Sequence, residues 1–159
     1  RLVQADAAAM NLQLRVRPPR KADLPAWAGM RAALWPEVDP ELLASEASDL
    51  LHAADGGMFV AEVGGELVGL AEASLRHDYV NGTTSSPVGF LEAWYVAPAW
   101  RGRGVGRALL RAVEGWTRAL GCTELASDAL LDNTASHAAH RACGFVETER
   151  VVYFRKRVG

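Results

Sequence analysis

The chain has few of the features that mark specialised protein classes. Its 159 residues include only two cysteines, Cys122 and Cys143, and neither belongs to a CxxC pair. We therefore expect no disulfide framework, and we expect the protein to reside in the reducing cytoplasm. No apolar run approaches the roughly 20 residues that a membrane span needs. The formal net charge of −2 argues against a nucleic-acid-binding protein, which is usually strongly basic. We expect a cytoplasmic protein that binds neither membranes nor nucleic acids.

The first nine residues, RLVQADAAA, lack the cationic start, apolar core and cleavage pattern of a signal peptide. We interpret residues 1–9 as an N-terminal extension or cloning remnant. The rest of the chain, residues 10–159, has no repeats, no low-complexity run and no long linker. Half of the residues are hydrophobic, which is enough for one domain with a sizeable core.

Hydrophobic periodicity and turn residues predict the elements of this domain. In chain order they are a strand (12–17), two helices (23–34, 40–53), a hairpin (58–63, 67–76), a strand (88–96), a helix (104–120), a strand (123–128), a helix (133–143) and one or two final strands (145–156). The order β-α-α-β-β-β-α-β-α-β predicts an α/β fold whose mixed sheet contains a parallel βαβ unit.

The strand VGFLEAWYV, residues 88–96, is apolar on both faces, as is typical of a central strand. Strict alternation places Phe90 and Trp94 on one face and Leu91 and Ala93 on the other. Glu92 lies in the middle of this strand. Its ionised carboxylate would be costly to bury without a cation as partner.

After this strand comes WRGRGVGR, a turn rich in glycine and arginine. Glycines let backbone N–H groups converge, and the start of the next helix adds partial positive charge, so the turn favours an anion such as phosphate. The P-loop and dinucleotide fingerprints are both absent. The pattern [QR]-x-x-G-x-[GA] is present at Arg101, Gly104 and Gly106. A purely structural glycine loop is the alternative.

With this loop and with the later stretch NTASHAAHRACGF, the chain resembles the GNAT superfamily of N-acetyltransferases. The resemblance implies the GNAT fold, with a mixed, mostly antiparallel central sheet whose parallel βαβ unit holds acetyl-CoA. It places the cofactor on Trp94, Tyr95, Val96, Arg101, Gly102, Arg103, Gly104, Val105, Gly106, Arg107 and Asn133. Many members carry a tyrosine that protonates the departing thiolate, whereas this chain has His140 there. An imidazole can do the same work near neutral pH, or His140 merely packs beside the cofactor.

The acidic residues indicate the second substrate. Glu92 lies in one predicted strand of the βαβ unit and Asp128 ends the other, and ligands gather at the carboxyl ends of such strands. Glu149 is a third candidate. Converging carboxylates favour a polycationic amine and can deprotonate it directly or through water. Each carboxylate has a structural salt bridge as its alternative role.

Three stretches are closely similar to the aminoglycoside 6'-N-acetyltransferases of the GNAT type: RHDYVNG…SSPVGFLEAWYV, ELASDALLDNTASHAAHRACGF and ETERVVYFRKR. The similarity extends over residues 10–157. It implies that Trp35, Tyr79, Glu92, Asp128 and Glu149 bind the antibiotic. It also implies a homodimer with the C-terminal region at its interface, so that Glu149 completes a neighbour's pocket.

These observations together predict an enzyme that moves an acetyl group from acetyl-CoA to the 6'-amine of an aminoglycoside, with Glu92, Asp128 and His140 as catalytic residues. Two alternatives remain, a GNAT enzyme for a polyamine or peptide amine, and a non-catalytic module that binds acyl-CoA or sequesters aminoglycosides. We expect no metal site, because His137 and His140 are one helical turn apart without an evident third ligand.

Overall fold

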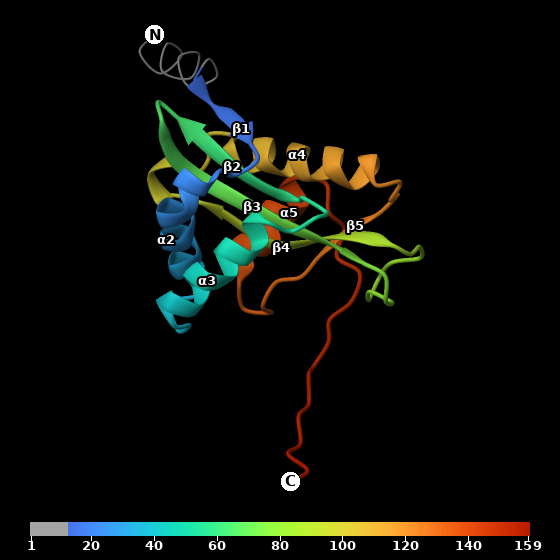
Figure 1. Cartoon of the computed structure of the whole chain (residues 1–159). Coiled ribbons are helices and arrows are strands. Elements are labelled where there is room, and N and C mark those ends of the chain that lie inside the picture. Colours follow the sequence, from blue (N-terminus) through green and yellow to red (C-terminus); the bar gives the residue numbers. More distant parts are fainter. Residues whose placement is uncertain (1–12) are drawn as a thin grey trace.

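A mixed sheet of five strands lies at the centre of the computed structural model, which describes residues 13–159 (Figure 1). The strands follow chain order across the sheet: β1 (Arg15–Arg17), β2 (Met58–Val63), β3 (Glu66–Arg76), β4 (Val88–Val96) and β5 (Leu125–Ser127). Neighbours from β1 to β4 are antiparallel, and β4 and β5 are parallel. The predicted mixed sheet with its parallel unit is therefore confirmed. The extension expected at residues 1–9 lies outside the described residues.

The helices begin and end close to their predicted positions. They are α2 (Leu24–Leu34), α3 (Pro40–Leu51), α4 (Val105–Ala119) and α5 (Thr134–Ala142), with short 3-10 turns η1 (Lys21–Asp23) and η2 (Pro98–Trp100). Side-chain caps fix two of the starts, because Asp39 accepts a hydrogen bond from the Glu41 N–H and Asn133 accepts one from the Ser136 N–H. Local capping chemistry thus explains why these boundaries are readable in the sequence.

Asp23 occupies the N-cap position of α2 but does not cap the helix through its side chain. Its carboxylate instead accepts hydrogen bonds from the Arg17 guanidinium at 2.7 and 3.0 Å and from the Arg20 N–H at 2.6 Å. The hydrogen bonds from Arg17 are the main reason that the pKa of the Asp23 carboxyl lies below its usual value. Asp23 thus joins β1 to the start of α2.

The sheet is covered on both faces, and each face has its own core (Figure 1). On one face, α4 packs Leu109 and Val113 against Ala71, Ala73 and Leu91 of β3 and β4. The other face packs against α2 and α3, with Trp27, Met30, Ala47, Met58, Leu70 and Ala93 in the shared core. Burial of this apolar surface is the main stabilising term and fixes which side of the sheet each helix occupies.

A β-bulge in β4 changes the facing of its side chains. Glu72 of β3 pairs with Ala93 and Ala73 pairs with Leu91, so Glu92 has no partner on β3. Leu91 and Trp94 therefore lie on the same face, against α4, whereas strict alternation predicts opposite faces. That prediction is wrong because the extra residue shifts the alternation by one position. Glu92 and Ala93 both lie on the face covered by α2 and α3.

The final strands predicted within residues 145–156 are absent from the structure. Residues 145–159 contain no helix or strand. Phe145 still packs against the core, whereas the C-terminal end of the chain runs away from the sheet (Figure 1). Several large apolar side chains there are exposed, namely Val146, Val151, Val152, Tyr153, Phe154 and Val158. The β-branched and aromatic residues 151–154 favour a strand, but a strand also needs a partner edge. Within residues 13–159 this segment pairs with none.

A buried ionic network lies between the sheet and α2. Arg31 of α2 contacts Glu72 of β3 and Glu46 of α3, each at 2.5 Å, and the Trp27 indole N–H donates to Glu72 at 2.7 Å. The side chains of Arg31 and Glu72 are only 6% and 5% exposed. Removing one partner of a buried pair leaves the other charge uncompensated. The network therefore links α2, α3 and β3.

We expect Arg31→Met to lower the free energy of unfolding by about 3–5 kcal/mol, because it leaves the Glu72 carboxylate buried without its cation. Arg118→Met is the matched control, since Arg118 is exposed in the last turn of α4, and we expect it to change stability by less than about 0.5 kcal/mol. Urea unfolding followed by circular dichroism measures both. Equal losses in the two variants would contradict the assignment.

Candidate active site

The sheet opens into a fork between β4 and β5. Their parallel pairing ends at Leu91 opposite Ser127. Beyond that point β4 pairs with β3 alone, so its other edge has no strand partner from Glu92 to Val96 among the described residues. Glu92 and Asp128 each follow the last residue of the β4–β5 pairing. The two strands are therefore neighbours, as predicted, and both residues lie where the strands begin to separate.

Glu92 is engaged by a cation from the neighbouring strand. The Arg76 guanidinium contacts Glu92 through Nη2 at 2.8 and 2.9 Å and through Nε at 3.2 Å. The Ser74 hydroxyl donates to the same carboxylate at 2.6 Å. The side chains of Arg76 and Glu92 are 42% and 36% exposed. The bulge thus turns Glu92 towards solvent, and Arg76 is the cation that the sequence requires for it.

A cavity of about 460 Å³ lies on the α2 and α3 side of Glu92. Trp35 forms part of its wall and is held by Arg31, whose guanidinium carbon lies 4.9 Å from the indole ring centre. Its lining includes four carboxylates, Glu46, Asp49, Glu72 and Glu92. Such a cavity suits a cationic ligand with apolar ring faces.

Sequence reasoning missed three of these carboxylates, Glu46, Asp49 and Glu72. Glu46 and Asp49 lie one turn apart on α3, and this spacing alone is equally typical of a solvated helix face. Glu72 has a clearer signal, since it interrupts the apolar run of β3. A buried strand carboxylate of this kind predicts a buried cation partner.

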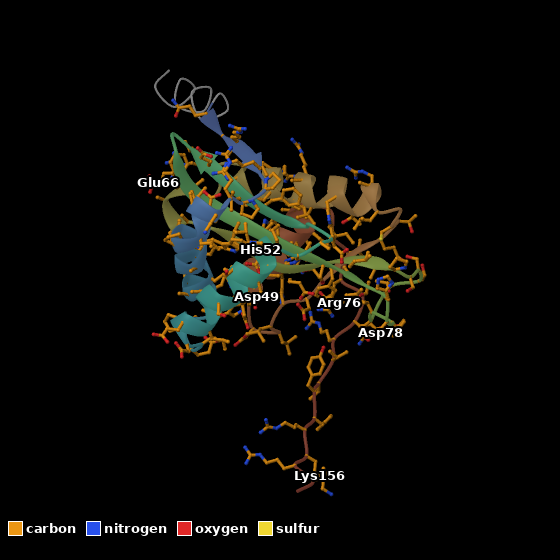
Figure 2. The ribbon with its side chains drawn as sticks, in the orientation of Figure 1. Asp49, His52, Glu66, Arg76, Asp78 and Lys156 are labelled. Carbon is orange, nitrogen blue, oxygen red and sulfur yellow. The ribbon has the colours of Figure 1, made fainter. Side chains whose placement is uncertain are left out.

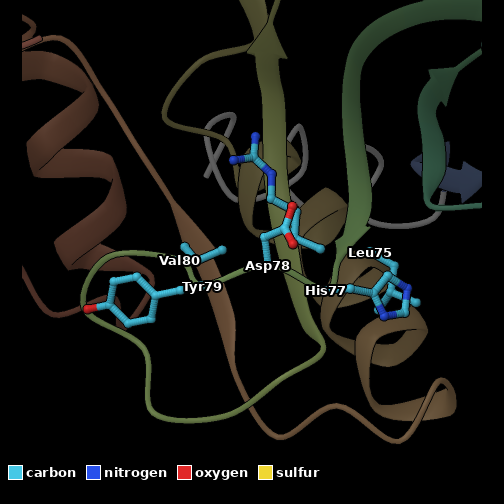
Figure 3. Close-up of a pocket in the computed structure, with 6 residues that line it drawn as sticks. Leu75, His77, Asp78, Tyr79 and Val80 are labelled. Carbon is cyan, nitrogen blue, oxygen red and sulfur yellow. The ribbon is translucent and has the colours of Figure 1, made fainter.

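A second cavity, also of about 460 Å³, is formed by Leu75 to Val80 where β3 ends (Figure 3). Tyr79 is part of its lining and is 74% exposed. Arg76 lines this cavity, whereas Glu92 lines the other. The Arg76–Glu92 ion pair therefore lies between the two cavities.

The segment that carries Tyr79, residues 77–87, is held at two places. Glu124, just before β5, accepts hydrogen bonds from the Ser85 hydroxyl at 2.5 Å and the Thr84 N–H at 2.9 Å. These hydrogen bonds keep the pKa of the Glu124 carboxyl below its usual value, and the bond from Ser85 contributes most. Gly82 lies directly against Thr148. Glu149 follows Thr148 and is exposed, so it lies near residues 77–87 of its own chain.

The glycine- and arginine-rich turn leads into α4 as predicted. Gly102 and Gly104 have positive φ angles of 71° and 85°, which only glycine adopts without strain. Gly104 is the N-cap of α4 and provides no side-chain cap. A Cβ at Gly102 or Gly104 would meet nothing within 4 Å. The backbone is thus uncrowded at both glycines, and the first N–H groups of α4 have no acceptor within the helix, an arrangement that fits a phosphate.

Contacts to the backbone hold the other residues of this turn in place. Arg101 Nε donates to the Val96 carbonyl and Arg107 Nη2 to the Ala142 carbonyl, each at 2.8 Å. The Trp94 indole N–H donates to the Gly106 carbonyl at 3.0 Å. Since each guanidinium has five N–H donors, both arginines keep donors for an anion. The turn is thereby tied to β4 and to the end of α5.

His140 of α5 lies at the closed end of the fork. Its Nε2 is 2.8 Å from the Ser127 hydroxyl, and its Nδ1 is 2.7 Å from the Ser136 carbonyl. The ring also packs edge-on against Trp94 and Phe145. A carbonyl can only accept, so Nδ1 carries a proton. The Ser127 hydroxyl, which also lies 3.3 Å from the Leu91 carbonyl, can donate to Nε2 when the ring is neutral and accepts from Nε2 when both ring nitrogens carry protons.

Within residues 13–159, no set of three or more His, Cys, Asp or Glu side chains is arranged to hold a metal ion. None of the helices in this part of the chain combines the length and the apolar character needed to cross a membrane.

We expect Gly82→Ala to destabilise the protein by about 1–3 kcal/mol more than Gly64→Ala. Both glycines have positive φ angles, 78° and 58°, so both variants share the backbone penalty. Only at Gly82 would the new Cβ collide with Thr148, because Gly64 has open space. Chemical denaturation compares the two, and equal losses would show that Thr148 does not hold residues 77–87.

Comparison with known proteins supports the resemblance noted in the sequence. Residues 24–145 match the Acetyltransferase (GNAT) family. An aminoglycoside N(6')-acetyltransferase type 1 of Stenotrophomonas maltophilia is 60% identical over 141 residues, which are 88% of this chain and 91% of that protein. The enzyme of the same name from Salmonella enteritidis is 44% identical over 142 residues, 89% of this chain and 98% of that protein.

Solved structures show the same architecture. The aminoglycoside N-acetyltransferase AAC(6')-Iy in complex with CoA superposes with a TM-score of 0.87 at 43% identity, covering 91% of this chain and 95% of that one. AAC(6')-Iy with the bisubstrate analog CoA-S-monomethyl-acetylneamine gives a TM-score of 0.85 at 43% identity, with coverages of 91% and 99%. The expected fold and family are confirmed, and the chain belongs to the GNAT family of acetyltransferases.

Proposed function

We propose that the protein transfers the acetyl group of acetyl-CoA to the 6'-amine of aminoglycoside antibiotics and thereby confers resistance to them. The observation that carries this proposal is the 60% identity, over 88% of the chain, to an aminoglycoside N(6')-acetyltransferase type 1. The AAC(6')-Iy complex supports it, because its bisubstrate analog joins CoA to an acetylneamine.

The residues present fit acetyl-CoA, which supplies the acetyl group as a thioester. Residues 102–107 combine the first N–H groups of α4 with Arg103 and Arg107, and they would hold the pyrophosphate. The unpaired edge of β4 offers backbone groups from Trp94 to Val96 for the rest of the cofactor. Asn133 caps α5 and would thereby shape the end of the cofactor site.

The acidic cavity beside the fork would hold the aminoglycoside. Trp35 and Tyr79 supply ring walls at the two cavities, and the cavity carboxylates attract ammonium groups. Glu92 and Asp128, where β4 and β5 begin to separate, would hold the 6'-ammonium and take its proton directly or through water, because only the neutral amine attacks a thioester. Glu149 would add a further carboxylate.

His140 would return a proton to the departing thiolate. For this step the ring would carry protons on both nitrogens, with Nδ1–H directed at the Ser136 carbonyl and Nε2–H at the Ser127 oxygen. The Ser127 O–H proton would pass to the thiolate while Nε2 donates its proton to the Ser127 oxygen, which leaves a neutral ring that regains its proton from solvent. The contacts with Trp94 and Phe145 keep the ring in this orientation.

A homodimer in the cytoplasm is the form that we propose for the active protein. Support for the dimer comes from the exposed apolar residues of the C-terminal segment and from the outer edge of β5, which has no strand partner among the described residues. An exposed apolar segment of strand-forming residues and an open sheet edge are complementary surfaces. The cytoplasmic location rests on the two cysteines, both of which are free.

Release of CoA thiol from acetyl-CoA in the presence of a panel of amines tests the reaction. The panel contains kanamycin, tobramycin, a gentamicin component with a 6'-hydroxyl in place of the amine, spermidine and a basic peptide. We expect rapid release with kanamycin and tobramycin and none with the 6'-hydroxyl compound, because that compound lacks the nucleophile.

The outcomes of this panel separate the three hypotheses for the chain. Activity only with spermidine or the peptide would retain the family and contradict the aminoglycoside assignment. Release with none of the amines, although acetyl-CoA binds, would favour a non-catalytic module. Equal release with the 6'-hydroxyl compound would show that a different amine is acetylated.

Sedimentation velocity tests the dimer. We expect the wild type to sediment as a dimer at micromolar concentration, and the double variant Val152→Glu/Phe154→Glu as a monomer, since it places two charges in an apolar interface. Lys156→Glu is the control on the same segment (Figure 2) and should leave the dimer intact. A monomeric wild type would contradict the proposal.

A further inference from the structure

Arg76 forms an ion pair with Glu92, the carboxylate that we assign to the binding of the substrate amine. Its guanidinium contacts both oxygens of Glu92 and lies over the Phe90 ring, with 3.6 Å from the guanidinium carbon to the ring centre. Both acceptor oxygens of Glu92 therefore already have a donor in this structure. An incoming ammonium can reach Glu92 fully only if Arg76 gives up at least part of this contact.

The two arginines beside the acidic cavity differ in how easily they can move. Arg31 is buried and pairs with the buried Glu72, so its departure would leave a carboxylate uncompensated in the core. Arg76 and Glu92 are both more than a third exposed. Water can solvate each of them after they separate, so breaking this pair costs little. Arg31 is thus a fixed cation and Arg76 an exchangeable one.

We propose that Arg76 competes with the substrate for Glu92, so that an amine must displace its guanidinium before it can be acetylated. The proposal rests on the assignment of Glu92 as the site of the reacting amine. Displacement exchanges one ion pair for another, so a substrate with a single ammonium gains little from Glu92.

A polycation compensates for the free energy of displacing Arg76 by making further contacts in the cavity. Asp49 of α3 lines the same cavity as Glu92 and forms no ion pair within residues 13–159. A second ammonium on the same molecule has Asp49 to bind, whereas a monoamine has no second charge to offer. Arg76 therefore weakens the binding of all amines to Glu92. Mainly polycations have enough further contacts to bind despite this competition.

The displaced Arg76 guanidinium can pair with another carboxylate, Asp78. Asp78 lines the cavity at the end of β3 together with Arg76 (Figures 2 and 3). The two residues are separated in the chain by His77 alone. A change of the Arg76 rotamer within this cavity would exchange Glu92 for Asp78 without moving the backbone.

Kinetics of Arg76→Gln and Arg76→Lys test the competition. We expect Arg76→Gln to lower KM by about fivefold for kanamycin and for a 6-amino-6-deoxyglucoside with one ammonium, with kcat within twofold of wild type. Arg76→Lys keeps the charge but loses the bidentate contact with Glu92. Its KM should therefore lie between that of the wild type and that of Arg76→Gln. Arg118→Gln, on the exposed end of α4, is the control and should match the wild type.

The salt dependence gives a second readout. In the wild type the monoamine replaces one cation with another, whereas in Arg76→Gln it joins an unpaired carboxylate. Added salt should therefore raise the monoamine KM more steeply in Arg76→Gln. A higher KM or a lower kcat in Arg76→Gln would instead show that Arg76 holds Glu92 in its productive position, and unchanged kinetics would show that Arg76 is a bystander. Either result would overturn the proposal.

The proposed function and this inference fail in different ways. If the wild type acetylates no aminoglycoside, the proposed function is wrong whatever Arg76 does. If the wild type is active and the KM of Arg76→Gln does not fall, only the inference is wrong. Thermal unfolding and the KM for acetyl-CoA, both expected to be unchanged in the variants, verify that fold and cofactor site are intact.

Discussion

The β-bulge at Glu92 is the constraint on which the rest of the site depends. One extra residue in β4 leaves Glu92 without a partner on β3, and it turns Glu92 and Ala93 towards the same face of the sheet. Without the bulge, Ala93 would face α4 and both cores would need to be repacked. The bulge lies next to the fork, so the irregular part of the sheet is also the part that would carry the chemistry.

Two glutamates on neighbouring strands have opposite roles because of this geometry. Glu72 lies in the regular part of β3, is buried, and is held by Arg31 and Trp27. Glu92 lies in the bulge, is partly exposed, and has a partner that can leave. The first carboxylate is fixed in a structural network and the second is available to a ligand. Burial and the mobility of the partner cation distinguish them, since both side chains are chemically the same.

The sequence predicts the elements far better than the details of the site. Helix boundaries follow from local capping by Asp39 and Asn133, and the fork follows from the β4–α4–β5 order. The bulge was not predicted, because alternation carries no sign of an inserted residue. Asp49 and Arg76 were missed because their roles depend on contacts between α3, β3 and β4. The C-terminal strands were predicted from strand-forming residues, but residues 145–159 pair with no strand within the described chain.

The most direct test of this account compares Glu72→Gln with Glu92→Gln, measuring in each the free energy of unfolding and kcat/KM for kanamycin. The account predicts that Glu72→Gln loses stability while its folded fraction keeps kcat/KM within a few-fold. It predicts that Glu92→Gln keeps stability and loses kcat/KM by about a hundredfold or more. A catalytic defect confined to Glu72→Gln, or full activity in Glu92→Gln, would contradict it.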